Sequence, residues 1–376
     1  MKKIILIVGA RPNFMKAYPI YRALSNKYNL TLIHTGQHYD EKMSKIFFEE
    51  FNFPKPDIQL KIESNSKAGN IENELYIENT NIDYDCIINK LLKNNNLGQI
   101  SEIRDKLIDE FIKINPDLVI VFGDITSTLS ASLAAKSLNI NIAHIESGLR
   151  SFDKEMPEEI NRIIVDKLSD YYFITENSGI TNLIKENITN NLFLVGNTMI
   201  DCLCLFLNKI EKLNTYKNYN LEKNNYYLIT LHRPSNVDNY DNLNTIFEQI
   251  KVLAKNNKII FPVHPRTKKN LNVDNLTIII IIEPLGYFEF ISLLKNCKAI
   301  ITDSGGIQEE ATYLNKQCFT LRKNTERPQT LTINGGTNIL INDIDNLELI
   351  DFKDIKINLW DGKTSERILD ILDKLL

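Results

Sequence analysis

Short apolar runs alternate along this chain with longer segments in which apolar residues recur at helical spacing. Residues 4–8, 118–122 and 299–301 are apolar throughout, as is typical of strands buried on both faces of a parallel sheet. Segments such as 100–114 separate these runs and carry the helical spacing. The alternation predicts an α/β fold built on doubly wound parallel sheets, whose ligands bind at the carboxyl ends of the strands.

The alternation occurs twice, which indicates two domains. A chain of 376 residues exceeds the roughly 250 to 300 residues at which one hydrophobic core stops growing. Residues 214–225 are polar and lack an apolar period, and the alternation restarts after them. We therefore expect a Rossmann-like domain over 1–213 and a second one over 214–362, facing one cleft. Residues 61–97, rich in Asn, Lys and Glu, are interpreted as a surface insertion in the first domain.

The same pattern predicts the individual elements. The expected strands lie at 4–8, 30–34, 118–122, 140–145, 171–174, 192–195, 226–231, 259–263, 276–282, 299–301, 318–321 and 338–341. The expected helices lie at 14–26, 40–51, 100–114, 129–138, 199–213, 241–254, 309–314 and 364–375. A further helix is expected to begin at Pro157, because proline suits the first helical position.

Composition narrows the class of protein. Hydrophobic residues make up 43% of the chain and charged residues 24%, as in ordinary globular proteins. The formal net charge of -4 gives no bulk electrostatic reason to expect nucleic acid as a partner. No apolar stretch reaches the roughly 18 residues of a membrane span, and the first apolar run is too short for a signal peptide, so we expect a cytoplasmic protein with no membrane partner. The five cysteines are scattered without zinc-ligand spacing, so we expect reduced thiols and no metal site.

A glycine-containing turn in the second domain predicts an anion site. The apolar run 299–301 leads into Ser304, Gly305 and Gly306, after which a helical pattern begins. Two glycines allow a ligand to approach the backbone closely, Ser304 is expected at the N-cap, and the first helical turn presents free N–H groups. A diphosphate would suit this place. A capped helix after a tight turn explains the same residues without a ligand.

Polar side chains also gather where other predicted strands end. They are Arg11, Lys16, Gln37, His38, Asp124, Glu146, Glu158, His232, His264, Arg266, Ser304 and Arg327. Because the carboxyl ends of parallel strands bind ligands, their co-occurrence favours a catalytic site.

Each acid in this set has a structural alternative. Asp124 could cap a helix, and Glu146 could form an ion pair with Arg150. Glu158 or Glu159 could complement the dipole of a helix in its first turn. His232 is more difficult to explain structurally, because histidine titrates near neutrality.

Three acids and a histidine beside a basic, phosphate-compatible loop suggest general acid–base chemistry on a substrate that carries a diphosphate. Arg11, Lys16 and Arg327 could neutralise the charge that builds on a leaving diphosphate. No Gly-x-Gly-x-x-Gly follows the first strand and no Walker A loop is present, so a dinucleotide cofactor is not indicated.

Taken together, these motifs resemble the non-hydrolysing UDP-N-acetylglucosamine 2-epimerase family. The matching segments read GARPNFMK at 9–16, HTGQHYD at 34–40, GDITST at 123–128, HIESGLR at 144–150, MPEEINR at 156–162, GNT at 196–198, TLHR at 230–233, VHPRT at 263–267, TDSGGIQEE at 302–310 and TERP at 325–328. They occur in the family's order and cover nearly the whole chain apart from 61–97. Ser147 and Ile125 depart from the residues usual in the family.

The resemblance implies a glycosyltransferase-B-like fold in which the C-terminal helix, 363–376, completes the first domain. It implies reversible inversion at C2 of UDP-GlcNAc to give UDP-ManNAc, by elimination and re-addition of UDP, without a cofactor and in a homodimer. Carried over by position, the catalytic acid–base residues are Asp124, Glu146, Glu158 and His232. The substrate-binding positions are Arg11, Lys16, Arg162, Arg233, Tyr287, Phe288, Ser304, Gly305, Gly306, Glu310 and Arg327, and Gln37 and His38 keep part of an allosteric site.

Three alternatives stay open at this point. A branch of similar enzymes epimerises UDP-2,3-diacetamido-2,3-dideoxy-glucuronate and carries the segments around Arg150 and Glu158 too. Hydrolysing epimerases release UDP and free ManNAc. A UDP-sugar glycosyltransferase shares the fold and the diphosphate site, but it would not need three clustered acids.

Overall fold

The computed structural model describes residues 1–36, 50–62, 91, 97–270, 278–345, 347–352 and 354–376. Its chain divides into two compact units. Unit 1 contains Met1–Cys202 and Leu359–Leu376, and unit 2 contains Leu203–Asn358. The division falls inside the continuous helix α8 (Thr198–Leu213), ahead of the polar stretch that the sequence suggested as the linker.

Unit 1 is built on a parallel sheet with the strand order β3-β2-β1-β4-β5-β6-β7. Its strands are β1 (Lys3–Val8), β2 (Asn29–His34), β3 (Ile58–Gln59), β4 (Leu118–Phe122), β5 (Asn141–Ser147), β6 (Tyr171–Ile174) and β7 (Leu192–Leu194). Its described helices include α1 (Arg11–Leu24), α4 (Leu97–Ile114), α5 (Thr126–Ser137), α6 (Pro157–Leu168), α7 (Asn177–Lys185) and α14 (Thr364–Leu375). Pro157 opens α6 as predicted.

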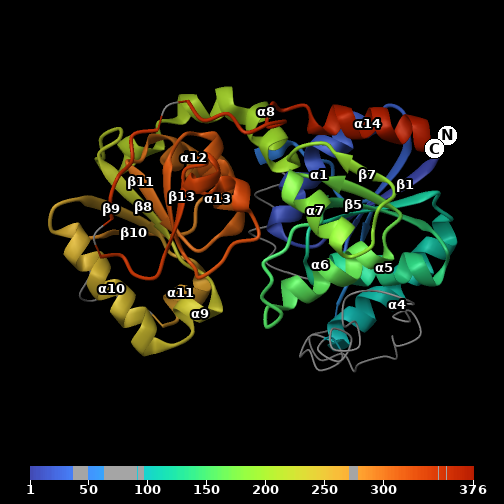
Figure 1. Ribbon diagram of the computed structural model, residues 1–376, viewed down its shortest axis with the longest axis horizontal. Helices are drawn as coiled ribbons and strands as arrows, with labels where there is room; N and C mark the ends of the chain where they lie inside the picture. The colour runs from blue at the N-terminus through green and yellow to red at the C-terminus, as the bar shows by residue number, and fades with distance from the viewer. Residues whose placement is uncertain (37–49, 63–90, 92–96, 271–277, 346, 353) are drawn as a thin grey trace. The chain divides into compact units, whose positions relative to one another are not determined.

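Unit 2 repeats the design with the parallel order β10-β9-β8-β11-β12-β13. Its strands are β8 (Tyr226–Thr230), β9 (Lys258–Pro262), β10 (Ile280–Ile282), β11 (Ala299–Thr302), β12 (Gln317–Leu321) and β13 (Asn338–Ile341). Besides the larger part of α8, its described helices include α9 (Pro234–Val237), α10 (Tyr240–Ala254), α11 (Pro265–Lys268), α12 (Tyr287–Asn296) and α13 (Gly305–Tyr313), with short 3-10 turns at Thr215–Tyr219, Pro328–Thr330 and Thr332–Asn334. The two sheets confirm the doubly wound α/β prediction (Figure 1).

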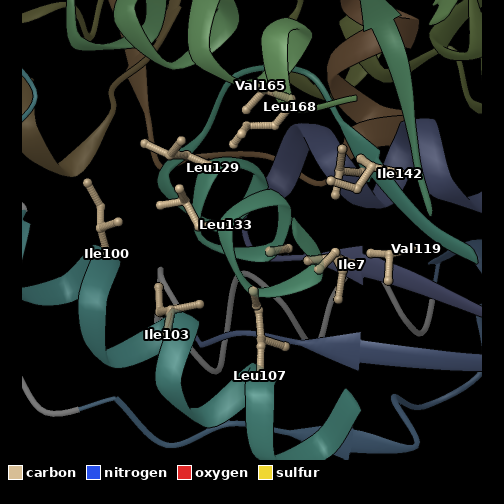
Figure 2. Close-up of a cluster of buried hydrophobic side chains, with 14 of the residues drawn as sticks. Ile7, Ile100, Ile103, Leu107, Val119, Leu129, Leu133, Ile142, Val165 and Leu168 are labelled. Carbon is tan, nitrogen blue, oxygen red and sulfur yellow. The ribbon is translucent and has the colours of Figure 1, made fainter. Parts of the chain in front are cut away.

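The core of unit 1 lies between its sheet and the helices that cover it. Figure 2 shows side chains of α4 and α5 meeting above the strands. The labelled residues are Ile7, Ile100, Ile103, Leu107, Val119, Leu129, Leu133, Ile142, Val165 and Leu168, all buried. The strands are apolar on consecutive positions because helices cover the sheet on both faces.

The C-terminal helix α14 belongs to unit 1, where it packs against α1 (Figure 1). The buried carboxylate of Asp201 accepts hydrogen bonds from the backbone N–H groups of Thr364 (3.0 Å) and Ser365 (2.7 Å), so it caps the start of α14 from another element. At the other end of the helix, Asp373 accepts a hydrogen bond from the hydroxyl of Tyr28 (2.8 Å).

Several boundaries differ from those expected. Helix α13 begins at Gly305 rather than at residue 309, because glycine has a low helix propensity and hid the first turn from the pattern. Helix α7 was not expected, since its polar first turn masks its period. The helix expected at 40–51 and the insertion at 61–97 fall mostly outside the described residues. Among the described helices, none is long and apolar enough to cross a membrane.

One buried histidine links β2 to α1. His34 ends β2, its ring stacks on Phe14 with centroids 5.4 Å apart, and its Nδ1 accepts a hydrogen bond from the N–H of Gly36 (3.1 Å). Burial lowers the pKa of His34 to about 4. A protonated Nδ1 could not accept the Gly36 hydrogen bond, so the folded protein favours the neutral ring.

This lowered pKa predicts a pH dependence of stability. Between pH 6.5 and about 4 the unfolded chain protonates His34 while the folded protein does not. The free energy of unfolding should therefore fall as the pH drops through this window, by up to about 3 kcal/mol from this residue. Urea denaturation at pH 7 and pH 4 measures the difference in wild type and in His34→Asn, which keeps an acceptor but does not titrate. Equal losses in the two proteins would contradict the assignment.

Candidate active site

In each unit the strand order reverses at one point, between β1 and β4 in unit 1 and between β8 and β11 in unit 2. Open α/β sheets bind ligands beyond the carboxyl ends of strands at such points. Lys16 lies in α1, which follows β1, and Asp124 follows β4. His232 follows β8 and Ser304 follows β11. The topology therefore brings these four residues to the switch points of their own units.

A buried ion pair lies at the switch point of unit 1. The ammonium of Lys16 contacts the carboxylate of Glu146, and the two side chains are 5% and 3% exposed. Gly123 makes the contact possible, because a Cβ at this position would lie 2.9 Å from Lys16 Nζ. Gly123 also has a φ of 61°, a left-handed conformation that favours glycine. Glu146 does not pair with Arg150, which contacts Asp166 and Glu186 instead.

Glu146 adopts a strained backbone conformation. Its φ is 74°, and the register between β5 and β6 shifts between Ile145 and Ser147, which marks a β-bulge. A non-glycine residue in this region costs about 1 to 3 kcal/mol and persists only where its surroundings hold it. Bulges change the direction in which a side chain points. At this bulge the side chain of Glu146 is directed toward Lys16.

The other two predicted acids of unit 1 lie on the loop after β4 and on α6. Asp124 pairs with Arg162 of α6 and is not a helix cap, since Ile125 occupies the N-cap of α5. Arg162 also contacts Glu159 (2.8 Å). Glu158, in the first turn of α6, is half-buried and forms no ion pair or hydrogen bond with any described residue.

Glu159, the neighbour of Glu158, fixes the loop that precedes α6. Its carboxylate accepts hydrogen bonds from the N–H of Ser151 (2.9 Å), the hydroxyl of Ser151 (3.0 Å) and the N–H of Phe152 (2.9 Å). Arg162 contacts the same carboxylate, so the carboxylate of Glu159 is occupied by residues of its own unit. Glu159 is therefore structural, and Glu158 is the acid of this pair that remains available.

In unit 2, Asp303 organises the residues around His232. The carboxylate lies 2.8 Å from Nδ1 of His232 and accepts hydrogen bonds from the backbone N–H groups of His232 and Arg233 and from the amide of Asn236. Burial opposes the ionised form of Asp303, but these hydrogen bonds and the charge of His232 outweigh it and hold the pKa of Asp303 below its ordinary value. The His232 ring, 42% exposed, is thereby fixed with its other nitrogen away from Asp303.

The glycine-containing turn lies at the start of α13 as predicted, but Ser304 and Gly305 make different contacts from those expected. Ser304 is the N-cap residue, yet its side chain makes no capping hydrogen bond, so the expected hydroxyl cap is absent. A Cβ on Gly305 would lie 2.5 Å from Glu326 Oε1 and 2.7 Å from Arg327 Nη1. Gly305 therefore makes room for these two side chains, while the N-terminus of α13 keeps the anion-binding geometry of any helix start.

Arg327 lies in a buried network of charges that the sequence did not reveal. Its guanidinium contacts Glu326 and, at 3.0 Å, Glu309. Glu326 also pairs with Arg322 (2.8 Å). The sequence suggested that Arg327 could neutralise charge on a leaving diphosphate, and in the structure two carboxylates also contact its guanidinium. Glu310, also buried, follows Glu309 in α13.

The remaining predicted residues lie in different surroundings. Tyr287 and Phe288 begin α12 and are buried, and the Phe288 ring lies 4.4 Å from Lys209 Nζ. Arg233 donates a hydrogen bond from Nε to the carbonyl of Asp303 (3.0 Å). Gln37, His38 and the side chain of Arg11 lie outside what the structure describes. Within the described ranges, no cluster of three or more His, Cys, Asp or Glu side chains could hold a metal ion.

The fold as a whole is similar to that of solved proteins. A crystal structure of Methanocaldococcus jannaschii UDP-GlcNAc 2-epimerase, in complex with UDP-GlcNAc and UDP, matches with a TM-score of 0.83 at 38% identity over 99% of each chain. With its two parallel sheets, this protein therefore has the two-domain glycosyltransferase-B-like fold.

Sequence comparison defines the family. The family model described as UDP-N-acetylglucosamine 2-epimerase matches residues 22–79 and 69–373. A UDP-N-acetylglucosamine 2-epimerase of M. jannaschii is 42% identical over 98% of both chains, and one of Methanococcus maripaludis is 41% identical over 100% of this chain and 92% of its own. The chain belongs to the UDP-N-acetylglucosamine 2-epimerase family, as its motifs predicted.

The uncapped start of α13 gives a prediction about Ser304. Because its hydroxyl makes no capping bond, Ser304→Ala should change the free energy of unfolding by less than about 0.5 kcal/mol. The matched control is Asn239→Ala, since Asn239 caps α10 by accepting a hydrogen bond from Asn242 N–H (2.9 Å) and should lose about 1 kcal/mol. Chemical denaturation compares the two. Equal losses would mean that Ser304 is a structural cap after all.

Proposed function

We propose that this protein catalyses the reversible inversion of C2 in UDP-N-acetylglucosamine, which gives UDP-N-acetylmannosamine. The observation that carries the proposal is family membership over nearly the whole chain, together with the acids of unit 1 and the histidine of unit 2 near the carboxyl ends of the strands. Isomerisation at a carbon without an acidic proton needs bases and acids positioned by the protein. Asp124, Glu146 and Glu158 supply such groups in unit 1.

The proposed reaction balances as an elimination followed by an addition. A carboxylate removes the C2 proton, the C1–O bond breaks, and UDP leaves with the electron pair, so that a C1=C2 double bond forms. A proton is then delivered to C2 from the opposite face of the ring, and a β-phosphate oxygen of UDP adds back to C1. The two proton transfers need two groups on opposite faces, which is why a single acid would not suffice.

We assign UDP binding to unit 2. The start of α13 presents backbone N–H groups to the diphosphate, and Glu310 follows for the ribose. His232, oriented by Asp303 through Nδ1, completes the acid–base set with its second nitrogen. We also assign five cations to the substrate, which are Arg233 and Arg327 of unit 2 and Arg11, Lys16 and Arg162 of unit 1. We also assign Tyr287 and Phe288, which begin α12 in unit 2, to substrate binding.

The family resemblance further supports a cytoplasmic homodimer. Gln37 and His38 are proposed as part of a second, regulatory UDP-GlcNAc site. The comparisons do not favour the diacetamido-glucuronate substrate or a glycosyltransferase.

Solvent exchange tests the reaction. Incubation of the enzyme with UDP-GlcNAc in deuterated water should place deuterium at C2 of both UDP-GlcNAc and UDP-ManNAc, because the proton added to C2 comes from an exchangeable group. Proton NMR and mass spectrometry measure the incorporation, and a free-UDP assay run in parallel should stay flat. Substrate binding without exchange, or steady release of UDP, would overturn the proposal.

Two substitutions test the acids of unit 1. Glu146→Gln and Asp124→Asn should each lower kcat by about 10²- to 10⁴-fold, the usual contribution of a general acid or base. UDP affinity, measured by calorimetry, should stay within about 1–2 kcal/mol, the scale of one altered hydrogen bond. Because Glu146→Gln removes the charge that Lys16 faces in a buried site, thermal denaturation must first show a folded variant. Full activity in both variants would show that the site is wrongly assigned.

A further inference from the structure

Four ionisable side chains are buried at the carboxyl end of β5, outside the residues assigned above to catalysis or substrate binding. They are His144 of β5, Arg150 of the following loop, Asp166 of α6 and Glu186 at the end of α7, with side-chain exposures of 0%, 1%, 0% and 9%. Removing an ionised group from water costs free energy, so a buried cluster of ionisable side chains is unusual and needs partners that offset this cost. We call these four residues the buried quartet.

Asp166 is the centre of the quartet, and its contacts flank Glu146. One carboxylate oxygen lies 2.6 Å from Nδ1 of His144. The other accepts a hydrogen bond from the N–H of Gly148 (3.0 Å) and lies 2.7 Å from Nη1 of Arg150. His144 and Gly148 stand two residues before and two residues after Glu146. A single carboxylate thus holds both sides of the β-bulge.

The same network reaches the end of β4. Nε2 of His144 lies 2.8 Å from the carbonyl oxygen of Gly123, the residue before Asp124. Each ring nitrogen of His144 thus contacts an oxygen atom of another element. Asp166 is therefore connected through His144 to the turn that carries the second acid of unit 1.

The rest of the quartet keeps Asp166 ionised and in place. Arg150 bridges Asp166 to Glu186, whose carboxylate it binds with two hydrogen bonds of 2.7 and 2.6 Å. Burial opposes the ionised form of Asp166, but the charges of Arg150 and His144 outweigh it and hold the pKa of Asp166 below its ordinary value.

The backbone that Asp166 holds would not keep its shape unaided. Glu146 has a φ of 74° and Gly148 a φ of 80°. Gly148 also packs so closely that a Cβ would lie 2.5 Å from the carbonyl oxygen of Gly179. Strained conformations of this kind persist where the surroundings over-determine them, and they cluster at active sites.

From this geometry we propose that Asp166 is a positioning residue for the reaction, which fixes the Glu146 bulge and the Gly123 turn through Gly148 and His144. It acts on the acids and not on the substrate. The proposal rests on the proposed function, in which Glu146 and Asp124 are acid–base residues.

Asp166→Asn tests the proposal, because an amide cannot accept all three hydrogen bonds that the carboxylate accepts. We expect kcat for UDP-GlcNAc epimerisation to fall about 10- to 100-fold, the effect of a small misplacement of a reacting group, with KM and UDP affinity changed less than about 3-fold. The matched control is Glu186→Gln, which removes one carboxylate charge from the same quartet but contacts Arg150 rather than the bulge. It should lower Tm by a similar amount and keep kcat within about 3-fold.

Two kinetic outcomes would overturn the proposal: an unchanged kcat in Asp166→Asn, or an equal loss of kcat in Glu186→Gln, which would trace the effect to stability alone. Crystal structures of wild type and Asp166→Asn supply a readout independent of activity. The wild-type φ of Glu146 should be positive and the variant's negative, with a regular register between β5 and β6. A positive φ in the variant would count against positioning.

The structural readout also separates this inference from the proposed function. If wild type failed to epimerise UDP-GlcNAc but Asp166→Asn lost the β-bulge, the proposed function would be wrong. The positioning of the bulge by Asp166 would then still stand. If Asp166→Asn does not fold, His144→Gln removes the contact on one side of Glu146 and carries the same expectations.

Discussion

The ion pair between Lys16 and Glu146 is the contact around which unit 1 is arranged. Taking two opposite charges out of water costs several kcal/mol for each ion, and their attraction offsets this only with good geometry. The contact between Lys16 and Glu146 involves the backbone at two other places, residue 123 and the end of β5. Residue 123 has a left-handed φ of 61° that favours glycine, and a Cβ there would lie 2.9 Å from Nζ of the lysine. The end of β5 bulges at the glutamate that meets this lysine. Stability alone would be served better by an apolar pair, which is why we regard the contact as functional.

Unit 2 follows the same principle with different residues. Asp303 is buried and ionised because backbone and side-chain donors converge on it, and it fixes the His232 ring. Arg327 is buried because Glu309 and Glu326 balance it. In both units, neighbours outside the proposed site hold the residues that we assign to the ligand. In the proposed function, the start of α13 therefore supplies much of the positive potential for a diphosphate in unit 2, since carboxylates balance Arg327.

The sequence predicted the fold well because its signal is local. Apolar runs such as 118–122 are read directly, and polar residues after them mark the ligand edge of a parallel sheet. Asp124, Glu146, His232 and Ser304 were predicted in this way.

The supporting residues could not be predicted by the same means. Asp166 looks like any polar residue near the end of a helix, and its role depends on a strand segment about 20 residues away. Nor could spacing reveal that Glu146 has a positive φ, or that Ser304 leaves its helix uncapped, since both depend on tertiary contacts.

The tertiary cap of α14 by Asp201 has a consequence for the order in which the protein matures on the ribosome. The strands of unit 1 are synthesised first, but the helix that packs on α1 follows only after the 156 residues of unit 2, Leu203–Asn358. At 5–20 residues per second, this leaves unit 1 waiting roughly 10 to 30 s with an apolar face uncovered. Unit 1 is therefore complete only once α14 has been synthesised and has packed on α1.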